Sequence, residues 1–420
     1  MKKKNVLLVG AGGVAHVAAH KFAQSNDLFE NIHMASRSVD SCEQIIESIE
    51  RKNNYKDPAK KIQIKQIDAL NVSEMIKLIK DLKISITVNL ASAFCNMSIL
   101  EACIEAGSAY IDTAIHEEPN KVCENPPWYA NYEWKRKDRC QNGGITAILG
   151  SGFDPGVVNA YAAYAKKHFF ATIDTIDIMD VNVGSHGKYF ATNFDPEINF
   201  REFVKVWTWI DKQWVCKPVH SEKQVCNFPV VGKQTVYLTG HDELHSLSKN
   251  IDAKSIRFWM GFSDHYINCF NVLRNIGLLS EKPVKTAEGL EVVPLKVVKA
   301  CLPDPKALAA NYTGNTCIGD LIAGIGTKDN CKKELFIYNV CDHKACYEEV
   351  ESQAISYTAG VPAVAAAILI ARGEWDVKKM VNVEELNPDP FIDLLKDIGL
   401  PTEIIRVNYS SKYFNKSLKK

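Results

Sequence analysis

A glycine-rich turn close to the N-terminus constrains the fold of this chain more than any other segment. The apolar run Val6–Val9 leads into Gly10-x-Gly12-x-x-Ala15, and a helix-like pattern follows over residues 14–25. In a dinucleotide-binding turn the first glycine permits the tight turn, the second lets the pyrophosphate approach the backbone, and the third position keeps helix and strand close. The free N–H groups of the helix then face the phosphates. The predicted contact residues are Gly10, Gly12, Gly13, Val14 and Ala15. The alternative is an ordinary glycine-rich strand–helix turn.

The end of the second expected strand indicates which dinucleotide binds. An enzyme that prefers NAD usually carries an acid there to accept a hydrogen bond from the ribose 2′-hydroxyl. This chain instead has Ser36-Arg37-Ser38. Arginine binds phosphate through a planar fork of charge-assisted hydrogen bonds, so Ser36 and Arg37 favour a 2′-phosphate and hence NADP(H). The alternative is that Arg37 is a solvated surface charge and Asp40 reaches the ribose.

Strand and helix patterns alternate through the first 150 residues, which predicts an α/β fold with a doubly wound parallel sheet of the Rossmann type. The expected strands are residues 6–9, 32–35, 62–67, 86–90, 110–112 and 145–149. The expected helices are residues 14–25, 42–52, 73–82 and 99–106.

The character of the sequence changes after Gly150. Strand-like alternation over residues 173–183 and 225–240, with an irregular or hairpin region from Pro283 to Pro294, predicts an α+β substrate domain over 151–351. Residues 352–420 begin with an alanine-rich helical pattern and are expected to continue as helices and loops. We find no flexible linker, which favours one domain inserted in, or wrapped around, the other.

Bulk properties exclude some classes of partner. Lys+Arg and Asp+Glu both number 50, so no net field favours nucleic acid or an anionic membrane. The most apolar run, Ala359–Ala371, is shorter than the ~20 residues that cross a bilayer and is expected to be a buried helix. The chain has 13 scattered cysteines and shows no secretory signal, which predicts reduced thiols and a cytoplasmic location.

Several residues follow expected strand ends, where ligands of such sheets bind. Asp68 is placed to face the adenine, or else is a surface acid or helix cap. The small residues Ala91 and Ser92 would let the dinucleotide pass. Asp112 is expected near the crevice, whereas His116 is expected to be a loop histidine in solvent.

The turn Gly150-Ser-Gly-Phe-Asp-Pro-Gly156 follows the last of these strands. We expect a helix that opens at Pro155 with Asp154 as its cap, because proline suits the first helical position. The turn would then present backbone N–H groups and Asp154 to the nicotinamide.

Two histidine pairs resemble metal motifs, namely His16 with His20 and His241 with His245. Neither has an obvious third ligand, so no metal site is predicted. Two polar segments, Ser255–Tyr266 and Asp180–Lys188, are candidates for a substrate pocket.

Motifs across nearly the whole chain resemble one family. The glycine turn, Tyr110-Ile-Asp112-Thr and Ile355-Ser-Tyr-Thr-Ala-Gly-Val-Pro362 are similar to the saccharopine dehydrogenase/reductase family. The middle segments point to its carboxynorspermidine synthase branch. They are His186–Pro196, His241–Leu247, Phe258–Phe262 and Tyr312–Gly319.

The resemblance implies a reaction, in which NADPH reduces the imine formed by aspartate β-semialdehyde and a diamine, putrescine or 1,3-diaminopropane. It also implies carboxylates for the cationic end of the diamine, with Asp112, Asp180 and Asp264 as candidates. For the amino-acid carboxylate, Arg257 is chosen over Arg201 and Arg274. His241 or His186 is the candidate for a proton relay. The catalytic candidates are therefore these two histidines together with Asp112. The resemblance alone also implies a homodimer, a role of domain 151–351 in dimerisation, and helices of residues 352–420 that pack back on the nucleotide domain.

Two other readings stay open. One is a saccharopine reductase that uses lysine as the amine. The other is a non-catalytic protein that senses NADP and binds a partner.

Overall fold

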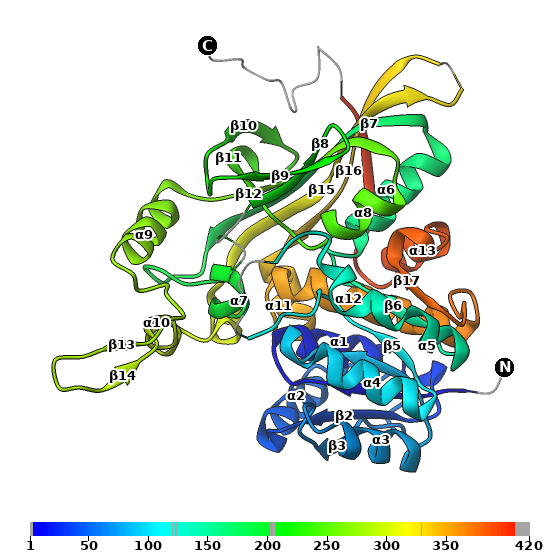
Figure 1. Cartoon of the computed structure of the whole chain (residues 1–420). Helices are drawn as coiled ribbons and strands as arrows, with labels where there is room; N and C mark the ends of the chain where they lie inside the picture. Colours follow the sequence, from blue (N-terminus) through cyan, green and yellow to red (C-terminus); the bar gives the residue numbers. More distant parts are fainter. Residues whose placement is uncertain are drawn as a thin grey trace.

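The computed structural model describes residues 3–119, 121, 124–201, 203, 206–328 and 330–407, which build two lobes on separate β-sheets (Figure 1). The first lobe has a parallel seven-stranded sheet in the order β17-β6-β5-β4-β1-β2-β3. Its strands are β1 (Asn5–Val9), β2 (Ile32–Ser36), β3 (Gln63–Gln66), β4 (Ile84–Asn89), β5 (Ala109–Ile111), β6 (Ala147–Leu149) and β17 (Met380–Asn382). Its helices are α1 (Gly13–Gln24), α2 (Val39–Arg51), α3 (Val72–Asp81), α4 (Asn96–Ala106) and α5 (Lys137–Asn142). The predicted doubly wound α/β sheet is confirmed.

The second lobe is a mixed sheet whose long central strands β7 (Phe170–Ser185) and β15 (Thr313–Gly326) pair antiparallel. The main path of the sheet runs β10-β11-β12-β7-β15-β16-β18, and β8 pairs with β12 and β9. The other strands are β8 (Val206–Ile210), β9 (Gln213–Lys217), β10 (Lys223–Phe228), β11 (Gly232–Thr239), β12 (Ala253–Gly261), β16 (Lys332–Asp342) and β18 (Glu403–Arg406). The described helices of this lobe include α6 (Val157–His168), α7 (Pro196–Arg201), α8 (Leu244–Asn250) and α11 (His343–Val350).

An arm projects from the second lobe, away from both sheets (Figure 1). It consists of α9 (Asp264–Asn275), the hairpin of β13 (Val284–Lys285) with β14 (Glu291–Val292), and α10 (Pro294–Cys301). The hairpin lies in the region expected from Pro283 to Pro294 to be irregular or a hairpin.

The C-terminal part of the chain returns to both lobes. Helix α12 (Ala354–Arg372) packs against α1 and also contacts β4, β5, β15 and β16, and α13 (Asp389–Asp397) packs against α12. Strand β17 joins the first sheet and β18 joins the second. Helix α12 is long and apolar enough to cross a bilayer, but 83% of its apolar window is buried inside the protein, as expected for a core helix. Residues 408–420 of the predicted C-terminal region lie outside the described residues.

The turn between β6 and α6 differs from the expectation. Helix α6 begins at Val157, the residue at its N-cap is Gly156, and the Asp154–Pro155 peptide bond is cis. Gly156 has φ +138°, and a Cβ there would lie 2.1 Å from the Gly152 carbonyl oxygen. The prediction that Pro155 opens the helix with Asp154 as its cap is therefore wrong, because the chain first closes a tight loop on Gly152.

Candidate active site

The glycine turn forms an open cradle at the start of α1. Gly10 has φ +123°, and a Cβ there would lie 2.5 Å from the Leu90 carbonyl oxygen. A Cβ on Gly12 would meet nothing within 4 Å, so open space lies beside the backbone where a pyrophosphate would approach. The N-cap of α1 is Gly12, which has no side chain to cap the first N–H groups. These groups are therefore available to phosphate oxygens, and the cradle fits a dinucleotide.

The polar residues after β2 lie at the expected adenosine end of the cradle. Arg37 is exposed, and its guanidinium has no hydrogen-bond or ion-pair partner among the described residues. Ser38 caps α2 by accepting a hydrogen bond from the Ser41 N–H at 3.2 Å. Asp40 is exposed in the first turn of α2. Both Arg37 and Asp40 can thus reach a ligand, and the cationic fork of Arg37 suits a 2′-phosphate.

Asp68 and Ala91 border the same region. Asp68 is exposed and accepts a hydrogen bond from the Leu70 N–H, so it forms a local turn and does not cap α3. The Ala91 N–H donates to the Asn89 side chain at 3.1 Å, and Ser92 follows as an exposed residue. Burial raises the pKa of the Cys95 thiol, while Arg37 lowers it and Asp68 raises it, which places both charges near Cys95. Arg37 and Asp68 follow the neighbouring strands β2 and β3.

One cavity of about 250 Å³ lies between the lobes, next to the cradle. Val14 of α1 and the Asp154–Pro155 turn line it, so it continues from the expected nicotinamide end of the cradle. The loop after β5 supplies Thr113 to Glu118, and α12 supplies residues of its first two turns. The second lobe supplies one wall, made by Asp180, Arg201, Trp207, His241, Asp242, His245, Met260 and Ile318.

The wall from the second lobe is acidic. Burial raises the pKa of Asp180 to about 6, although the nearby His241 lowers it, and one Asp180 carboxylate oxygen is buried without a hydrogen-bond partner. Burial likewise raises the pKa of Asp242 to about 6. Asp242 also connects the two lobes, because its Oδ2 accepts a hydrogen bond from the Ile115 N–H at 2.7 Å. A cationic ligand would neutralise these carboxylates.

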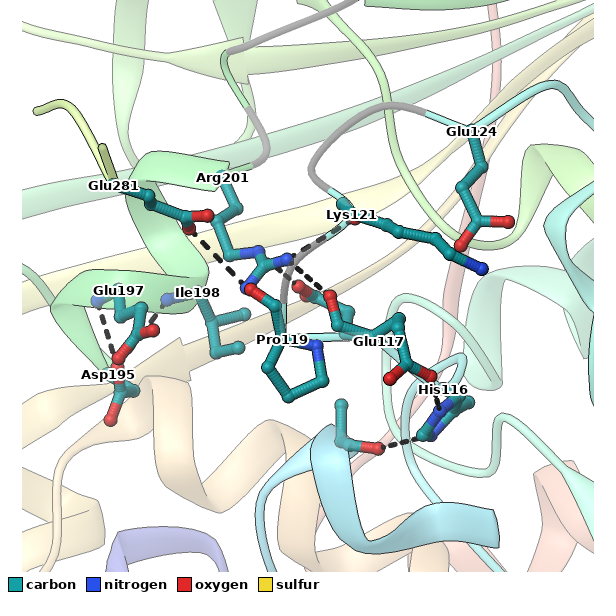
Figure 2. A network of polar contacts seen from close by, with 12 residues as sticks. His116, Glu117, Pro119, Lys121, Glu124, Asp195, Glu197, Ile198, Arg201 and Glu281 are labelled. Atoms are coloured by element: carbon teal, nitrogen blue, oxygen red, sulfur yellow. Dashed lines mark hydrogen bonds and ion pairs between the residues drawn. The ribbon is translucent and has the colours of Figure 1, made fainter. Parts of the chain in front are cut away.

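Arg201 lines the cavity and contacts residues of both lobes (Figure 2). Its side chain is 4% exposed, and its Nε lies 2.7 Å from Glu117 Oε2. Its Nη2 donates to the carbonyls of Glu118 at 2.9 Å and Lys121 at 3.3 Å, and Nη1 lies 3.4 Å from Glu281 Oε1. Through its Nη2 hydrogen bonds and its ion pairs with Glu117 and Glu281, Arg201 joins Glu117, Glu118 and Lys121 of the first lobe to α7 of the second, while its buried Nε makes no hydrogen bond with any residue that the structure describes.

Lys121 and several aromatic rings also line the cavity. The Lys121 Nζ lies 3.4 Å from the Tyr132 hydroxyl and 5.7 Å from the centre of its ring. In Figure 2 it extends toward Glu124. On the cavity wall, the His245 ring is stacked between Trp128 and Trp214, with centroids 4.4 and 4.9 Å away. Aromatic walls exclude water and favour cations over their faces.

Asp112 lies beneath the cavity and not on its lining. It is buried, its Oδ1 accepts a hydrogen bond from the Gly150 N–H at 2.6 Å, and its Oδ2 has no partner. Burial raises its pKa to about 7. Glu133 beside it accepts from the His116 N–H at 2.6 Å, and burial raises its pKa to about 8. His116, expected in solvent, is instead buried and lines the cavity, because its Nδ1 is held by the Ala93 carbonyl.

Four further residues named from the sequence lie away from the cavity. Arg257 forms a bidentate ion pair with Asp177 at 2.6 and 2.7 Å, because neighbouring side chains on β12 alternate and Met260 takes the cavity face. Asp264 is exposed at the start of α9, and Arg274 stacks on Phe270 near the end of that helix. His186 lies beyond the end of β7, with its ring against Tyr312.

The histidine pairs are engaged in protein contacts. His16 and His20 stack on one another inside the first lobe, where their Nε2 atoms meet the Val350 carbonyl and the Ser48 hydroxyl. Burial lowers the pKa of His245 to about 3. Within the described ranges, no group of three His, Cys, Asp or Glu residues is arranged to hold a metal ion.

The raised carboxyl pKa values predict a pH-dependent stability. Burial raises the pKa of Glu117 to about 7, as it does for Asp112, and that of Glu133 to about 8. These groups keep protons in the folded state that the unfolded chain has lost, so stability decreases as the pH rises through their folded pKa values. The buried histidines oppose this near pH 6.5, where an unfolded histidine is about half protonated, and are neutral in both states only above about pH 7.5. We expect the free energy of unfolding, measured by urea titration, to fall between about pH 7.5 and pH 8.5.

Glu133→Gln should reduce that decrease, because its side chain stays uncharged, whereas Glu43→Gln on the exposed side of α2 should not. Equal pH dependence in the wild type and Glu133→Gln would contradict the assignment.

Comparison with known proteins agrees with this architecture. The saccharopine dehydrogenase NADP binding domain matches residues 6–148, and the saccharopine dehydrogenase C-terminal domain matches residues 152–400. A carboxynorspermidine synthase of Vibrio alginolyticus is 48% identical over 396 residues, which cover 94% of this chain and 95% of that protein. A carboxyaminopropylagmatine dehydrogenase of Synechocystis is 42% identical, with 94% of this chain and 96% of that protein covered. The solved structure of a saccharopine dehydrogenase (L-Glu forming) from Saccharomyces cerevisiae has a TM-score of 0.69 at 13% identity, covers 96% of this chain and 100% of that chain, and shows the shared fold.

Proposed function

This chain belongs to the saccharopine dehydrogenase family, and we propose that it joins L-aspartate β-semialdehyde to a diamine by NADPH-dependent reductive condensation. The diamine is putrescine or 1,3-diaminopropane, and the product is carboxyspermidine or carboxynorspermidine, which places the enzyme in polyamine biosynthesis. The observation that carries the proposal is the 48% sequence identity with a carboxynorspermidine synthase over nearly the full length of both chains. The charge pattern of the cavity supports it.

The reaction forms and reduces one C–N bond. The amine attacks the aldehyde carbon, the carbinolamine loses water, and the resulting iminium accepts a hydride at the same carbon. Overall, an ammonium, an aldehyde and NADPH give a secondary amine, water and NADP⁺. When bound, NADPH supplies the hydride, while the protein binds and orients the two substrates and manages the protons.

Two groups of cavity-lining residues suit the two substrates. Asp180 and Asp242 are proposed to hold the distal ammonium of the diamine, because one Asp180 oxygen is buried and unpartnered. Lys121 is proposed to bind the amino-acid carboxylate, since Arg201 is already paired with Glu117 and Glu281 and donates hydrogen bonds to loop carbonyls. His241 is proposed to move the proton. The cavity lining therefore supports the substrate-binding role of Asp180 and the proton-relay role of His241, and Lys121 replaces Arg257 in the proposal.

The diamine site can be tested by one neutral substitution. We expect Asp180→Asn to raise the KM for the diamine roughly 10- to 100-fold, because a charge-assisted hydrogen bond is lost. The KM for aspartate semialdehyde should change little. Asp264→Asn is the matched control, since Asp264 is an exposed carboxylate at the start of α9. Equal effects of the two substitutions on the diamine KM would contradict the assignment.

The function itself is tested with purified protein. NADPH oxidation is followed with aspartate semialdehyde and one amine at a time, namely putrescine, 1,3-diaminopropane, agmatine or lysine. We expect turnover with a diamine. Turnover with lysine alone would favour a saccharopine reductase, and NADPH binding without turnover on any pair would favour an NADP sensor. Turnover with agmatine alone would indicate the activity named for the Synechocystis relative.

We also propose that the protein is a cytoplasmic homodimer and that the arm forms the dimer interface. The arm and its base expose several large apolar side chains, and a two-stranded hairpin is only marginally stable unless it packs against another surface. They are Val272, Ile276, Val284, Leu290 and Val297. Ile276→Lys with Leu290→Lys should convert a dimer to a monomer in analytical ultracentrifugation, and a monomeric wild type would refute the dimer. The described cysteines are all free, in agreement with a reducing compartment.

A further inference from the structure

We propose that Glu243 is a positioning residue that forms one proton-transfer unit with His241. In this unit, Glu243 holds the imidazole so that its second nitrogen takes a proton from the incoming ammonium and returns it to the hydroxyl that leaves as water. The inference rests on the proposed function, because that function defines the ammonium and the carbinolamine as the groups that exchange the proton.

The contact between the two side chains is short. His241 Nδ1 lies 2.6 Å from Glu243 Oε2, and the Glu243 side chain is 0% exposed. We assign the proton of this contact to Nδ1, because a carboxylate accepts hydrogen bonds. That tautomer makes Nε2 the nitrogen that exchanges a proton with a substrate. His241 lines the cavity, whereas Glu243 lies behind it.

The carboxylate of Glu243 has no other described function in the fold. Its Oε1 is buried without a hydrogen-bond partner, and His241 supplies the only hydrogen bond to the carboxylate among residues of the described ranges. A buried carboxylate is costly unless its interactions repay the loss of solvent. Glu243 would therefore contribute most when the imidazole becomes positively charged during the reaction.

The ring of His241 is also held from one side. It stacks on Phe258 with centroids 4.1 Å apart and planes 10° from parallel. Phe258 is fully buried in β12, so this platform is rigid. The ring is thus fixed in plane by Phe258 and in rotation by Glu243, which is the arrangement that directed proton transfer requires.

The strands and the helix that pack around His241 and Glu243 each bring another ionisable side chain near them. Asp180 approaches from β7, His245 from α8, and Asp320 from β15, while Asp242 adjoins both residues in sequence and Asp154 lies near Asp320. Both carboxylate oxygens of Asp320 are buried without partners, and burial together with the charge of Glu243 holds its pKa well above the usual range. Asp320 therefore keeps its proton to a much higher pH than an ordinary aspartate does.

The proton balance closes within one turnover. His241 removes a proton from the attacking ammonium, so the neutral amine adds to the aldehyde carbon. The imidazolium then protonates the carbinolamine hydroxyl, the C–O bond breaks, and water leaves. The nitrogen lone pair forms the C=N bond of the iminium, and the hydride then adds to the iminium carbon. His241 has already given up its proton and is neutral for the next ammonium.

The test compares Glu243→Gln, His241→Asn and the double variant, with Glu384→Gln as a control. Glu384 is a buried carboxylate outside the cavity that accepts from the Asn159 and Asn250 amides. We expect Glu243→Gln to lower kcat roughly 10- to 100-fold, which is within the range of general acid–base effects. The acid limb of its kcat–pH profile should move to lower pH, because His241 must be neutral to accept the ammonium proton and its imidazolium form loses the neighbouring negative charge. The double variant should be no slower than His241→Asn, since residues that act as a unit are not additive.

Two further measurements keep the inference testable if folding changes. Glu243→Ala should regain activity with added formate, which can occupy the vacated space and accept from Nδ1. Nitrogen NMR of the wild type should show His241 protonated at Nδ1. A kcat within about twofold of wild type in Glu243→Gln would overturn the inference, because acid–base effects are larger. An Nε2-protonated His241 would also overturn it. Absence of any wild-type turnover would refute the proposed function, whereas the NMR result would still report the contact.

Discussion

Replacing Arg201 by methionine is expected to lower kcat/KM for the condensation roughly 100-fold or more, because a small misplacement of the groups that position a substrate costs about 100-fold in rate. The guanidinium joins Glu117 and the 117–121 loop of the first lobe to Glu281 and α7 of the second (Figure 2). Without it, the loop that carries Lys121 loses its anchor and Glu117 loses its counter-charge. Steady-state kinetics with NADPH, aspartate semialdehyde and a diamine would measure the effect.

Arg257→Met is the matched control for this experiment. Arg257 also pairs with a buried aspartate, but its partner Asp177 lies on the face of β7 that is turned away from the cavity. We expect a comparable loss of thermal stability and much less loss of kcat/KM below the unfolding temperature. A larger activity loss in Arg257→Met than in Arg201→Met would show that the amino-acid carboxylate binds elsewhere.

Replacing Arg37 by glutamate should reverse cofactor preference. The kcat/KM with NADPH should fall roughly 100-fold or more, since a charge-assisted contact to the 2′-phosphate is replaced by repulsion. The kcat/KM with NADH should change little or rise, because a carboxylate can accept from the ribose 2′-hydroxyl. The ratio of the two kinetic constants is the measurement.

Lys77→Glu provides the control for charge alone, since Lys77 is exposed on α3. It should leave the ratio unchanged. An unchanged ratio in Arg37→Glu would show that Arg37 is only a surface charge, and Asp40 would then be the residue to examine at the ribose.

The nucleotide lobe was the part most accessible from sequence. Short buried strands separated by amphipathic helices give clear patterns, and the expected strands and helices of residues 1–150 agree with the observed ones within about three residues. The returning strands β17 and β18 were not recognised, because they contain only three and four residues and depend on distant partners. The α6 start was misplaced, since proline at a helix start and proline in a tight loop look alike in sequence.

The site was harder to predict because it is assembled from both lobes. Asp180 and His241 were candidates, and both line the cavity. Glu117 and Asp242 were missed, because their raised pKa values arise from burial that only the assembled lobes create. Arg257 was chosen over Arg201 and Arg274 for the amino-acid carboxylate from the sequence alone. The side-chain alternation along β12 directs Arg257 to the far face, and the pairing register that decides this is not readable from one strand.

The most direct test of the account is the transfer of deuterium from NADPH labelled at the transferable C4 position. Purified protein would be incubated with this cofactor, aspartate semialdehyde and either putrescine or 1,3-diaminopropane, and the product analysed by mass spectrometry and NMR. We predict a carboxylated polyamine with one deuterium on the carbon that was the aldehyde. A product without the label, or labelled cofactor that is never consumed with either diamine, would contradict the account.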